Sequence, residues 1–104
     1  MPIAFVRDRL SVSTDRRRLN LDVVLEMLRA THWGADLTRA TLERAIANSL
    51  CFGLYDGATQ LGFARVVTDL ATYGYVTDVV IVEDRRGKGL GEWMVECILA
   101  HPDL

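Results

Sequence analysis

Cysteine, histidine and proline are scarce in this sequence, which contains two of each. Cys51 and Cys97 each lie in an apolar stretch outside any C-x-x-C motif, so we expect reduced thiols in the core rather than a disulfide framework. His32 and His101 are far apart, and the acidic residues are scattered along the chain. The sequence therefore offers no constellation that is typical of a metal site.

A basic excess and a long apolar run are also missing. The formal net charge is −2, which argues against general nucleic-acid binding. No stretch approaches the ~20 apolar residues of a membrane span, and the N-terminus has no signal-peptide h-region. We therefore expect a cytoplasmic protein that does not enter the membrane. The chain has 104 residues, and half of them are hydrophobic. This length and composition predict a single domain, residues 1–104.

The order of local patterns predicts a mixed α/β chain. Residues 3–13 alternate apolar and polar side chains as in an edge strand, and Asn20 can cap an amphipathic helix that ends near Thr31. Asp36 or Thr38 can cap a second helix. Three strands and a last helix follow, over Leu50–Tyr55, Gln60–Thr68, Tyr73–Val82 and Leu90–Ala100. The short connections between these strands predict an antiparallel meander.

The most informative stretch is residues 78–94, where an apolar strand runs into a basic, glycine-rich turn and then into a helix. Glycines let backbone N–H groups approach a phosphate, and a helix that begins near Leu90 adds unpaired N–H groups and the positive end of its dipole. The turn also carries three cations, Arg85, Arg86 and Lys88. This combination favours a ligand that bears phosphate.

Two common phosphate-binding motifs do not fit this turn. A P-loop needs Gly-Lys-Ser/Thr, but Lys88 is followed by Gly89. A dinucleotide fingerprint needs G-x-G-x-x-G, whereas Gly87, Gly89 and Gly91 give G-x-G-x-G, followed by the acidic Glu92. Another phosphate-binding motif must explain the turn.

Residues 86–91, Arg-Gly-Lys-Gly-Leu-Gly, match the pattern Arg/Gln-x-x-Gly-x-Gly/Ala. With the strand before it, this segment resembles the coenzyme A loop of the GNAT superfamily of acyl-CoA-dependent N-acyltransferases. The resemblance is specific over roughly residues 78–100. Before residue 78, only the order of the helices and strands is similar. The resemblance implies the N-terminal part of a GNAT-like α/β (α+β) fold: strand, two helices, antiparallel three-strand meander, helix.

Members of that family usually continue with a fifth strand, a further helix and a final hairpin, for which this sequence has no counterpart. The resemblance therefore implies a domain, 1–104, that is C-terminally incomplete and poorly active alone. Its fourth strand, rich in valine and isoleucine, would keep an open edge. Such an edge favours pairing with a second copy, as a homodimer, or with another chain.

By resemblance, this is an N-acetyltransferase in which an amine attacks the thioester carbonyl of acetyl-CoA directly, with no metal. The acceptor is a small-molecule or peptide amine that the sequence does not identify. Two other hypotheses remain open. The domain could bind acyl-CoA without catalysis, as a sensor or as half of an assembly, or the same loop could bind a nucleotide.

The resemblance also assigns the coenzyme A contacts. The pyrophosphate is held by the backbone N–H groups of the turn, contributed by Arg86, Gly87, Lys88, Gly89, Leu90 and Gly91. The pantetheine arm pairs with the backbone of the preceding strand as a pseudo-strand, along Val79, Val80, Ile81 and Val82. These are largely backbone roles, so they place few demands on side chains.

Candidates for catalysis lie at the start of that strand segment. The backbone N–H of Val79 or Val80 is the oxyanion donor by resemblance. Asp78 could accept the amine's proton through water, or it could be a structural hydrogen-bond acceptor.

Three aromatic residues are candidates for contact with the acceptor substrate. Trp33 follows the first helix, where it either shapes the acceptor pocket, as relatives do, or covers the sheet. Side chains alternate along a strand, so Tyr73 and Tyr75 are expected on the same face of the predicted strand as Val79 and Ile81. This placement favours packing in the core over contact with the substrate.

Overall fold

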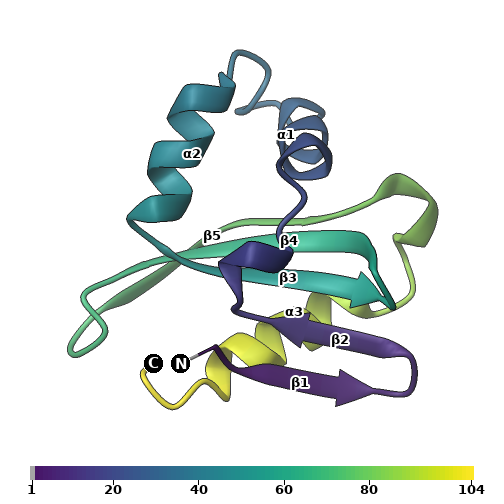
Figure 1. The fold of residues 1–104 in the computed structure, drawn as a ribbon, viewed down its shortest axis with the longest axis vertical. Helices are drawn as coiled ribbons and strands as arrows, with labels where there is room; N and C mark the ends of the chain where they lie inside the picture. The colour runs from purple at the N-terminus through teal and green to yellow at the C-terminus, as the bar shows by residue number, and fades with distance from the viewer. Residues whose placement is uncertain (1) are drawn as a thin grey trace.

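The computed structural model describes residues 2–104 and shows a five-stranded antiparallel sheet with helices on both faces (Figure 1). The strands lie in the sheet in chain order, and two helices are inserted between β2 and β3. The elements are β1 (Ala4–Arg7), β2 (Leu10–Ser13), η1 (Arg16–Arg18), α1 (Leu21–Arg29), α2 (Arg39–Ala47), β3 (Leu50–Asp56), β4 (Thr59–Thr68), β5 (Gly74–Ile81), η2 (Glu83–Arg85) and α3 (Leu90–Leu99). The predicted fold class is confirmed.

The first element differs from the prediction, because residues 3–13 form a hairpin rather than one edge strand. Asp8 has a φ of 54°, in the left-handed region that Asp tolerates better than most residues, and it reverses the chain between β1 and β2. Phe5 then lies opposite Val12, and the Thr14 N–H donates to Ile3 O at 2.9 Å. The alternating pattern was read correctly, but the turn within it was missed.

Both helices of the insertion begin where the sequence places a cap. The Asn20 side chain accepts from the Val23 N–H at the start of α1, and the Thr38 hydroxyl accepts from the Thr41 N–H at the start of α2. Of the two caps considered for α2, Thr38 is therefore the one used.

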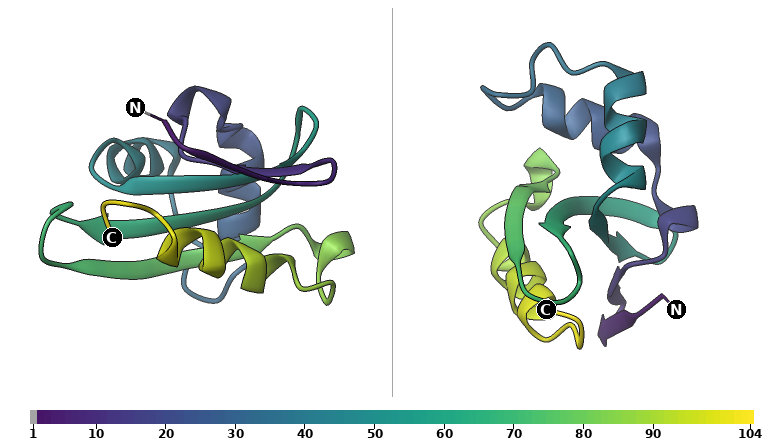
Figure 2. Two further views of the ribbon diagram at one scale, coloured as in Figure 1. Left: turned by 90° about the horizontal axis from the view of Figure 1, so that it is seen from below. Right: turned by 90° about the vertical axis from the view of Figure 1, so that its left-hand side faces the viewer.

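The helices cover opposite faces of the sheet (Figure 2). On one face, α1 and α2 pack over β3 to β5, with Leu28 and Leu42 against Phe63 and Val80. On the other face α3 packs Met94 and its buried neighbours against the sheet. Any site on β5 thus lies between an α1–α2 side and an α3 side.

Tyr55 is the largest fully buried side chain and lies in a close-fitting place on β3. A Cβ at Gly53 would lie 2.2 Å from the Tyr55 hydroxyl, so the ring occupies the space that a side chain at Gly53 would need. The guanidinium of Arg18 lies 4.1 Å above the ring. Burial raises the pKa of Tyr55 to about 12, and its hydroxyl has no hydrogen-bond partner among residues 2–104.

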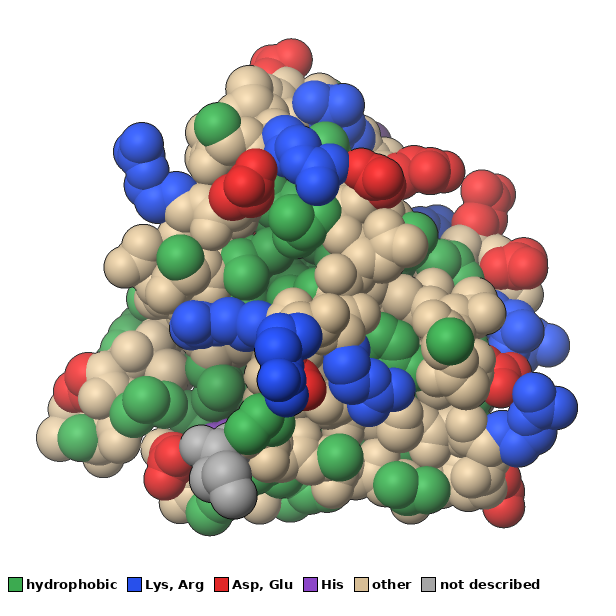
Figure 3. Space-filling view, in the orientation of Figure 1, with side chains coloured by type: hydrophobic (Ala, Val, Ile, Leu, Met, Phe, Trp, Pro, Cys, Tyr) green, Lys and Arg blue, Asp and Glu red, His purple; other side chains and the backbone are tan. Residues whose placement is uncertain are grey.

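The arginines of η1 have structural contacts, and Figure 3 shows basic side chains gathered over this segment. Arg16 Nη2 donates to Ser49 O at 3.0 Å, and Arg17 pairs with Asp15 at 3.1 Å. The Asp15–Arg17 contact lowers the pKa of Asp15 through the hydrogen bonds that Arg17 donates. These contacts help to position the segment between β2 and α1.

The predicted reduced thiols in the core are confirmed. Cys51 and Cys97 are both free and buried. Burial raises the pKa of Cys51 to about 11 and also raises the pKa of Cys97. Neither thiol has the lowered pKa of a nucleophilic cysteine.

Candidate functional site

The glycine-rich turn connects η2 to α3 and has the backbone that an anion site needs. Gly87 and Gly89 both have φ of 77°, a left-handed conformation that glycine adopts without steric cost. Apart from the adjoining residues of the chain, no atom of the described chain comes within 4 Å of where a side chain would begin at either glycine. Gly89 is the N-cap residue of α3 and supplies no side-chain bond to the first N–H groups of the helix. The turn therefore presents open space beside unpaired helix N–H groups.

The three predicted cations of the turn have different environments. Arg85 Nη1 lies 3.9 Å from Asp56 Oδ2 at the β3–β4 hairpin, so this cation is directed toward a carboxylate. Arg86 Nε donates to Ile81 O at 3.0 Å, and the side chains of Arg86 and Lys88 are exposed at the turn. Arg86 and Lys88 are thus the two cations available to an anionic ligand.

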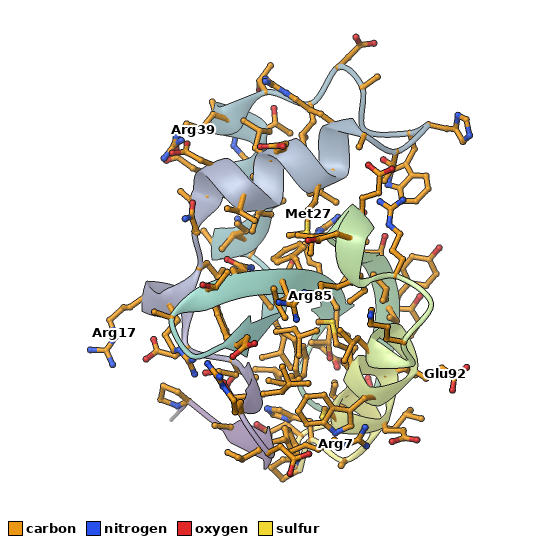
Figure 4. The ribbon with its side chains drawn as sticks, turned by 90° about the vertical axis from the view of Figure 1, so that its right-hand side faces the viewer. Arg7, Arg17, Met27, Arg39, Arg85 and Glu92 are labelled. Carbon is orange, nitrogen blue, oxygen red and sulfur yellow. The ribbon has the colours of Figure 1, made fainter. Side chains whose placement is uncertain are left out.

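A groove of about 300 Å³ runs between α1 and the end of β5. Met27 points from α1 toward this end of the sheet, whereas Glu92 points outward from α3 (Figure 4). Val23, Met27 and Ala30 provide apolar lining from α1, and Glu26, Gln60, Ile81, Val82, Glu83 and Arg86 complete the groove. The α1 residues were not predicted as part of the site, because in the sequence they form only an ordinary amphipathic stripe.

The outer edge of β5 is open, because β5 is the last strand of the sheet that residues 2–104 form. The Val82 N–H donates to Leu61 O of β4 at 2.8 Å. N–H groups alternate in direction along an antiparallel strand, so that of Val80, opposite Phe63, also faces β4, and counting back from it we expect those of Val79 and Ile81 to face the open edge. Of the two predicted oxyanion donors, Val79 is therefore the one expected to point outward.

A β-bulge interrupts β5 just before this segment. Thr77 lies opposite Arg65 and Val80 opposite Phe63, so Asp78 and Val79 together face a single residue of β4. Asp78 has a φ of 58°, in the left-handed region. The extra residue reverses the alternation of side chains between the two halves of β5.

This reversal makes the predicted placement of the two tyrosines wrong. Tyr75 precedes the bulge and, counted across it, lies on the opposite face from Val79 and Ile81. Tyr73 and Tyr75 are 61% and 59% exposed, so neither packs in the core. Alternation could not predict this outcome, because it assumes a strand without an inserted residue.

Asp78 lies at the centre of a hydrogen-bonded group. Its Oδ2 accepts from Arg65 Nε at 2.8 Å, and both side chains are mostly buried. Arg65 Nη1 in turn donates to the Ser49 hydroxyl at 3.1 Å. Trp33 Nε1 lies 3.3 Å from Asp78 Oδ1 and donates to it, although the indole is 68% exposed. The structure thus brings together two predicted residues, Trp33 and Asp78.

Arg65 belongs to this group but was not predicted. The sequence does contain a signal for it, because Arg65 is the one charged residue in the run Gln60–Thr68. A charge inside an otherwise buried strand requires a partner, and that partner is Asp78. Tyr73 is not part of the group. It lines a different groove, of about 310 Å³, with Ile98 and Leu104.

The histidines are not part of the turn or the bulge. His101 is buried, accepts from the Asp103 N–H through Nδ1 at 3.1 Å, and packs against Phe52 with the two rings nearly perpendicular. Within residues 2–104, no three His, Cys, Asp or Glu side chains gather as they would around a metal ion.

Comparison with known proteins identifies the family. Residues 21–101 match the model of the Acetyltransferase (GNAT) family, which covers both the bulge and the glycine-rich turn. The chain belongs to this GNAT family. The family carries out acyl transfer, so the general chemistry associated with this fold is acyl transfer.

Individual relatives agree with this membership. A candidate acetyltransferase from Gibberella zeae is 33% identical over 117 residues, covering 93% of this chain and 66% of the relative. The crystal structure of a candidate GNAT acetyltransferase from Xanthomonas campestris has a TM-score of 0.88 and 37% identity, covering 95% of this chain and 70% of that one. A GNAT-family protein from Streptococcus pneumoniae has a TM-score of 0.66 and 22% identity, covering 96% and 67%, and shows the shared fold.

The chain spans just under two thirds of the length of the Gibberella relative. Among residues 2–104, no helix is both long and apolar enough to cross a membrane.

Proposed function

We propose that this chain binds acetyl-CoA and acts in an N-acetyltransferase that transfers the acetyl group to an amine by direct attack. One observation carries the proposal: an open strand edge, at Val79, leads into a turn whose left-handed glycines leave space beside the N-terminus of α3. An extended ligand with amide groups and a terminal pyrophosphate fits that sequence of features.

The turn would bind the pyrophosphate of coenzyme A. The backbone N–H groups of residues 87–91 supply neutral donors, whereas that of Arg86 already donates to Glu83 O at 3.3 Å. Arg86 and Lys88 supply positive charge through their exposed side chains. The pantetheine arm would lie along the open edge of β5, within reach of the groove that Met27 lines from α1. This geometry supports the predicted coenzyme A contacts.

The reaction needs few groups from the protein. The amine nitrogen attacks the thioester carbonyl carbon, a C–N bond forms, the C–S bond breaks, and the sulfur leaves as the coenzyme A thiolate, which takes up a proton. The amine loses one proton in exchange. In this scheme the outward N–H of Val79 donates to the oxyanion that forms on the carbonyl oxygen.

The acceptor amine would approach from the α1–α2 side of β5. Trp33 is exposed there and contacts Asp78, and Tyr75 lies on the same face of the strand and is also exposed. Both rings can contact the body of an acceptor whose amine points toward Val79. Tyr73 remains a candidate contact for a larger acceptor, such as a peptide, that extends past the β4–β5 hairpin.

Calorimetric titration with acetyl-CoA tests the cofactor assignment. We expect wild-type chain to bind and Gly89→Glu to lose binding, because a carboxylate would enter the phosphate space. Gly57→Glu is the matched control and should bind as wild type does: Gly57, at the β3–β4 hairpin, also has a left-handed φ, of 59°, and an added Cβ there has no neighbour within 4 Å. Equal binding by Gly89→Glu and wild type would contradict the proposal.

Release of coenzyme A thiol in the presence of amines tests the reaction. A panel of benzylamine, spermidine and a peptide with a free N-terminus samples aromatic, polycationic and peptide acceptors. Thiol release that requires the amine supports an acetyltransferase. Binding without release in any amine favours the non-catalytic acyl-CoA domain, and ATP affinity that coenzyme A does not displace favours the nucleotide hypothesis.

A further inference from the structure

Asp78 has a left-handed backbone conformation, and both oxygens of its carboxylate accept hydrogen bonds. The hydrogen bonds help to hold the backbone in this conformation. A non-glycine residue with φ of 58° needs compensating interactions to stay in that conformation. The Asp78 carboxylate supplies them: Oδ2 accepts from Arg65 at 2.8 Å, and Oδ1 accepts from Trp33 at 3.3 Å. The side chain thus anchors the backbone at the point where β5 bulges.

Arg65 is itself held in place from a third element. Its Nη1 donates to the hydroxyl of Ser49, a buried residue between α2 and β3. The carbonyl oxygen of Ser49 accepts from Arg16 at 3.0 Å. The guanidinium of Arg65 therefore bridges the bulge of β5 to the start of β3, and its two bonds use nitrogens whose spacing is rigid.

The residue after the anchored position is Val79, whose N–H faces the open edge. Its direction depends on the backbone of Asp78, because a residue in the left-handed region redirects the next peptide unit. We infer that the Arg65–Asp78 ion pair is a positioning device, which fixes the bulge so that the Val79 N–H points at the thioester carbonyl. In this assignment, which rests on the proposed function, Asp78 takes no proton during the reaction.

A role for Asp78 as proton acceptor fits the structure less well. Its side chain is 12% exposed, and both carboxylate oxygens already accept hydrogen bonds. Protonation would leave the guanidinium of Arg65, 21% exposed, without its anionic partner. The proton of the attacking amine would then have to be taken by water or by another group.

Three substitutions at position 78 separate the two roles. Asp78→Asn keeps a side chain that tolerates the left-handed region, Asp78→Gly keeps the conformation without a side chain, and Asp78→Ala loses both. A positioning role predicts activity in the order Asn above Gly above Ala, because Asn can still accept from Arg65 and glycine keeps only the conformation. If Asp78 accepts the proton, turnover should fall equally in all three variants, because none of the new side chains can take a proton.

The main readout is the amide NMR shift of Val79 with acetyl-CoA minus its shift with coenzyme A. Coenzyme A lacks the thioester carbonyl, so the difference reports the hydrogen bond to that oxygen and needs no acceptor. We expect the difference in wild type, its loss in Asp78→Ala and only a partial recovery in Asp78→Gly, which keeps the conformation but loses the contact with Arg65. Arg65→Lys, which keeps the charge but cannot bridge Asp78 and Ser49 in the same way, should show an intermediate value.

Turnover supplies the second readout, with the amine of the panel that reacts fastest. We expect kcat to fall about 100-fold in Asp78→Ala, the usual effect of a lost oxyanion donor. It should fall less than about tenfold in Asp78→Asn, with an unchanged dependence of kcat/KM on pH. Arg39→Ala is the control, because it removes an exposed ion pair with Asp22 away from β5.

The outcomes distinguish this inference from the proposed function. If wild-type chain binds no acetyl-CoA, the proposed function and this inference both fail. If acetyl-CoA binds and the Val79 shift difference is the same in all variants, the positioning role fails and the function stands. A changed pH profile in Asp78→Asn, with equal loss in all three variants, would make Asp78 the proton acceptor. If Asp78→Ala does not fold, the comparison of Asp78→Gly with Asp78→Asn and Arg65→Lys still distinguishes a positioning role from a proton-accepting role.

Discussion

The indole nitrogen of Trp33 lies 3.3 Å from Oδ1 of Asp78, a residue 45 positions later in the chain. This hydrogen bond joins the segment between α1 and α2 to the bulge of β5. It is a direct link between the side of the molecule proposed to receive the acceptor and the strand proposed to bind acetyl-CoA. Trp33 is exposed, whereas the other tryptophan, Trp93, is buried against α3's side of the sheet.

Replacing Trp33 with Phe should separate stability from ligand response. The exposed indole contributes little to the core, so we expect the free energy of unfolding to change by less than about 0.5 kcal/mol. We expect the tryptophan fluorescence of wild type to change when acetyl-CoA is added. This change should disappear in Trp33→Phe, because the remaining Trp93 is shielded from the ligand. Urea denaturation and a fluorescence titration check both points. A response that persists in Trp33→Phe would show that Trp33 does not sense the ligand.

The parts of the fold that the sequence predicted are those set by local chemistry. Asn20 and Thr38 cap helices through contacts three residues away, and a glycine-rich turn lies between the last strand and the last helix as expected. The features that were missed depend on pairing between strands. The turn at Asp8 and the bulge at Asp78 are both left-handed aspartates, and their sequence neighbours do not distinguish them from ordinary strand residues.

The same distinction applies to the candidate site. The glycine-rich turn was predicted because the residues that form it are consecutive in the sequence. The Arg65–Asp78–Trp33 group was not, because its members come from β4, β5 and the α1–α2 segment and meet only in the folded chain. One inserted residue at Asp78 was enough to reverse the predicted face of Tyr75.

Gly89→Ala and Gly91→Ala should have opposite effects on stability. Gly89 has a φ of 77°, so a methyl group there is strained although it meets no neighbour, and we expect a loss of about 1 kcal/mol. Gly91 lies in the first turn of α3 with a nearest neighbour at 4.0 Å, so alanine should stabilise the helix by up to about 1 kcal/mol. Chemical denaturation measures both values. Equal effects would mean that the turn relaxes away from the left-handed conformation.

Stability should decline at alkaline pH because two acidic groups are buried in their neutral forms. Burial raises the pKa of Cys51 to about 11 and that of Tyr55 to about 12, above their ordinary values of about 9 and 10. The unfolded chain releases these protons at lower pH than the folded chain does. The free energy of unfolding should therefore be constant with respect to these groups below about pH 9 and fall between about pH 9 and 12, by up to about 1.4 kcal/mol per pH unit for each group.

Tyr55→Phe isolates one part of this decline. The Tyr55 hydroxyl has no hydrogen-bond partner among residues 2–104, so its removal should change stability at neutral pH by less than about 1 kcal/mol. Above about pH 10, the variant should lose stability more slowly than wild type. Tyr73→Phe, at an exposed position, is the control. A decline of the same slope in Tyr55→Phe and wild type would contradict the assignment to Tyr55.

The open edge of β5 predicts self-association of this chain. β5 spans Gly74–Ile81 and presents unpaired backbone groups, whereas β1, the opposite edge, is only four residues long. A long edge rich in β-branched residues favours pairing with a second copy, and a charged side chain on it opposes pairing. We expect Tyr75→Lys on β5 to reduce the association, and Val6→Lys on β1 to leave it unchanged. Sedimentation velocity over a range of concentrations measures it. If both variants associate as wild type does, another surface joins the chains; if wild type stays monomeric throughout, the edge is protected in solution.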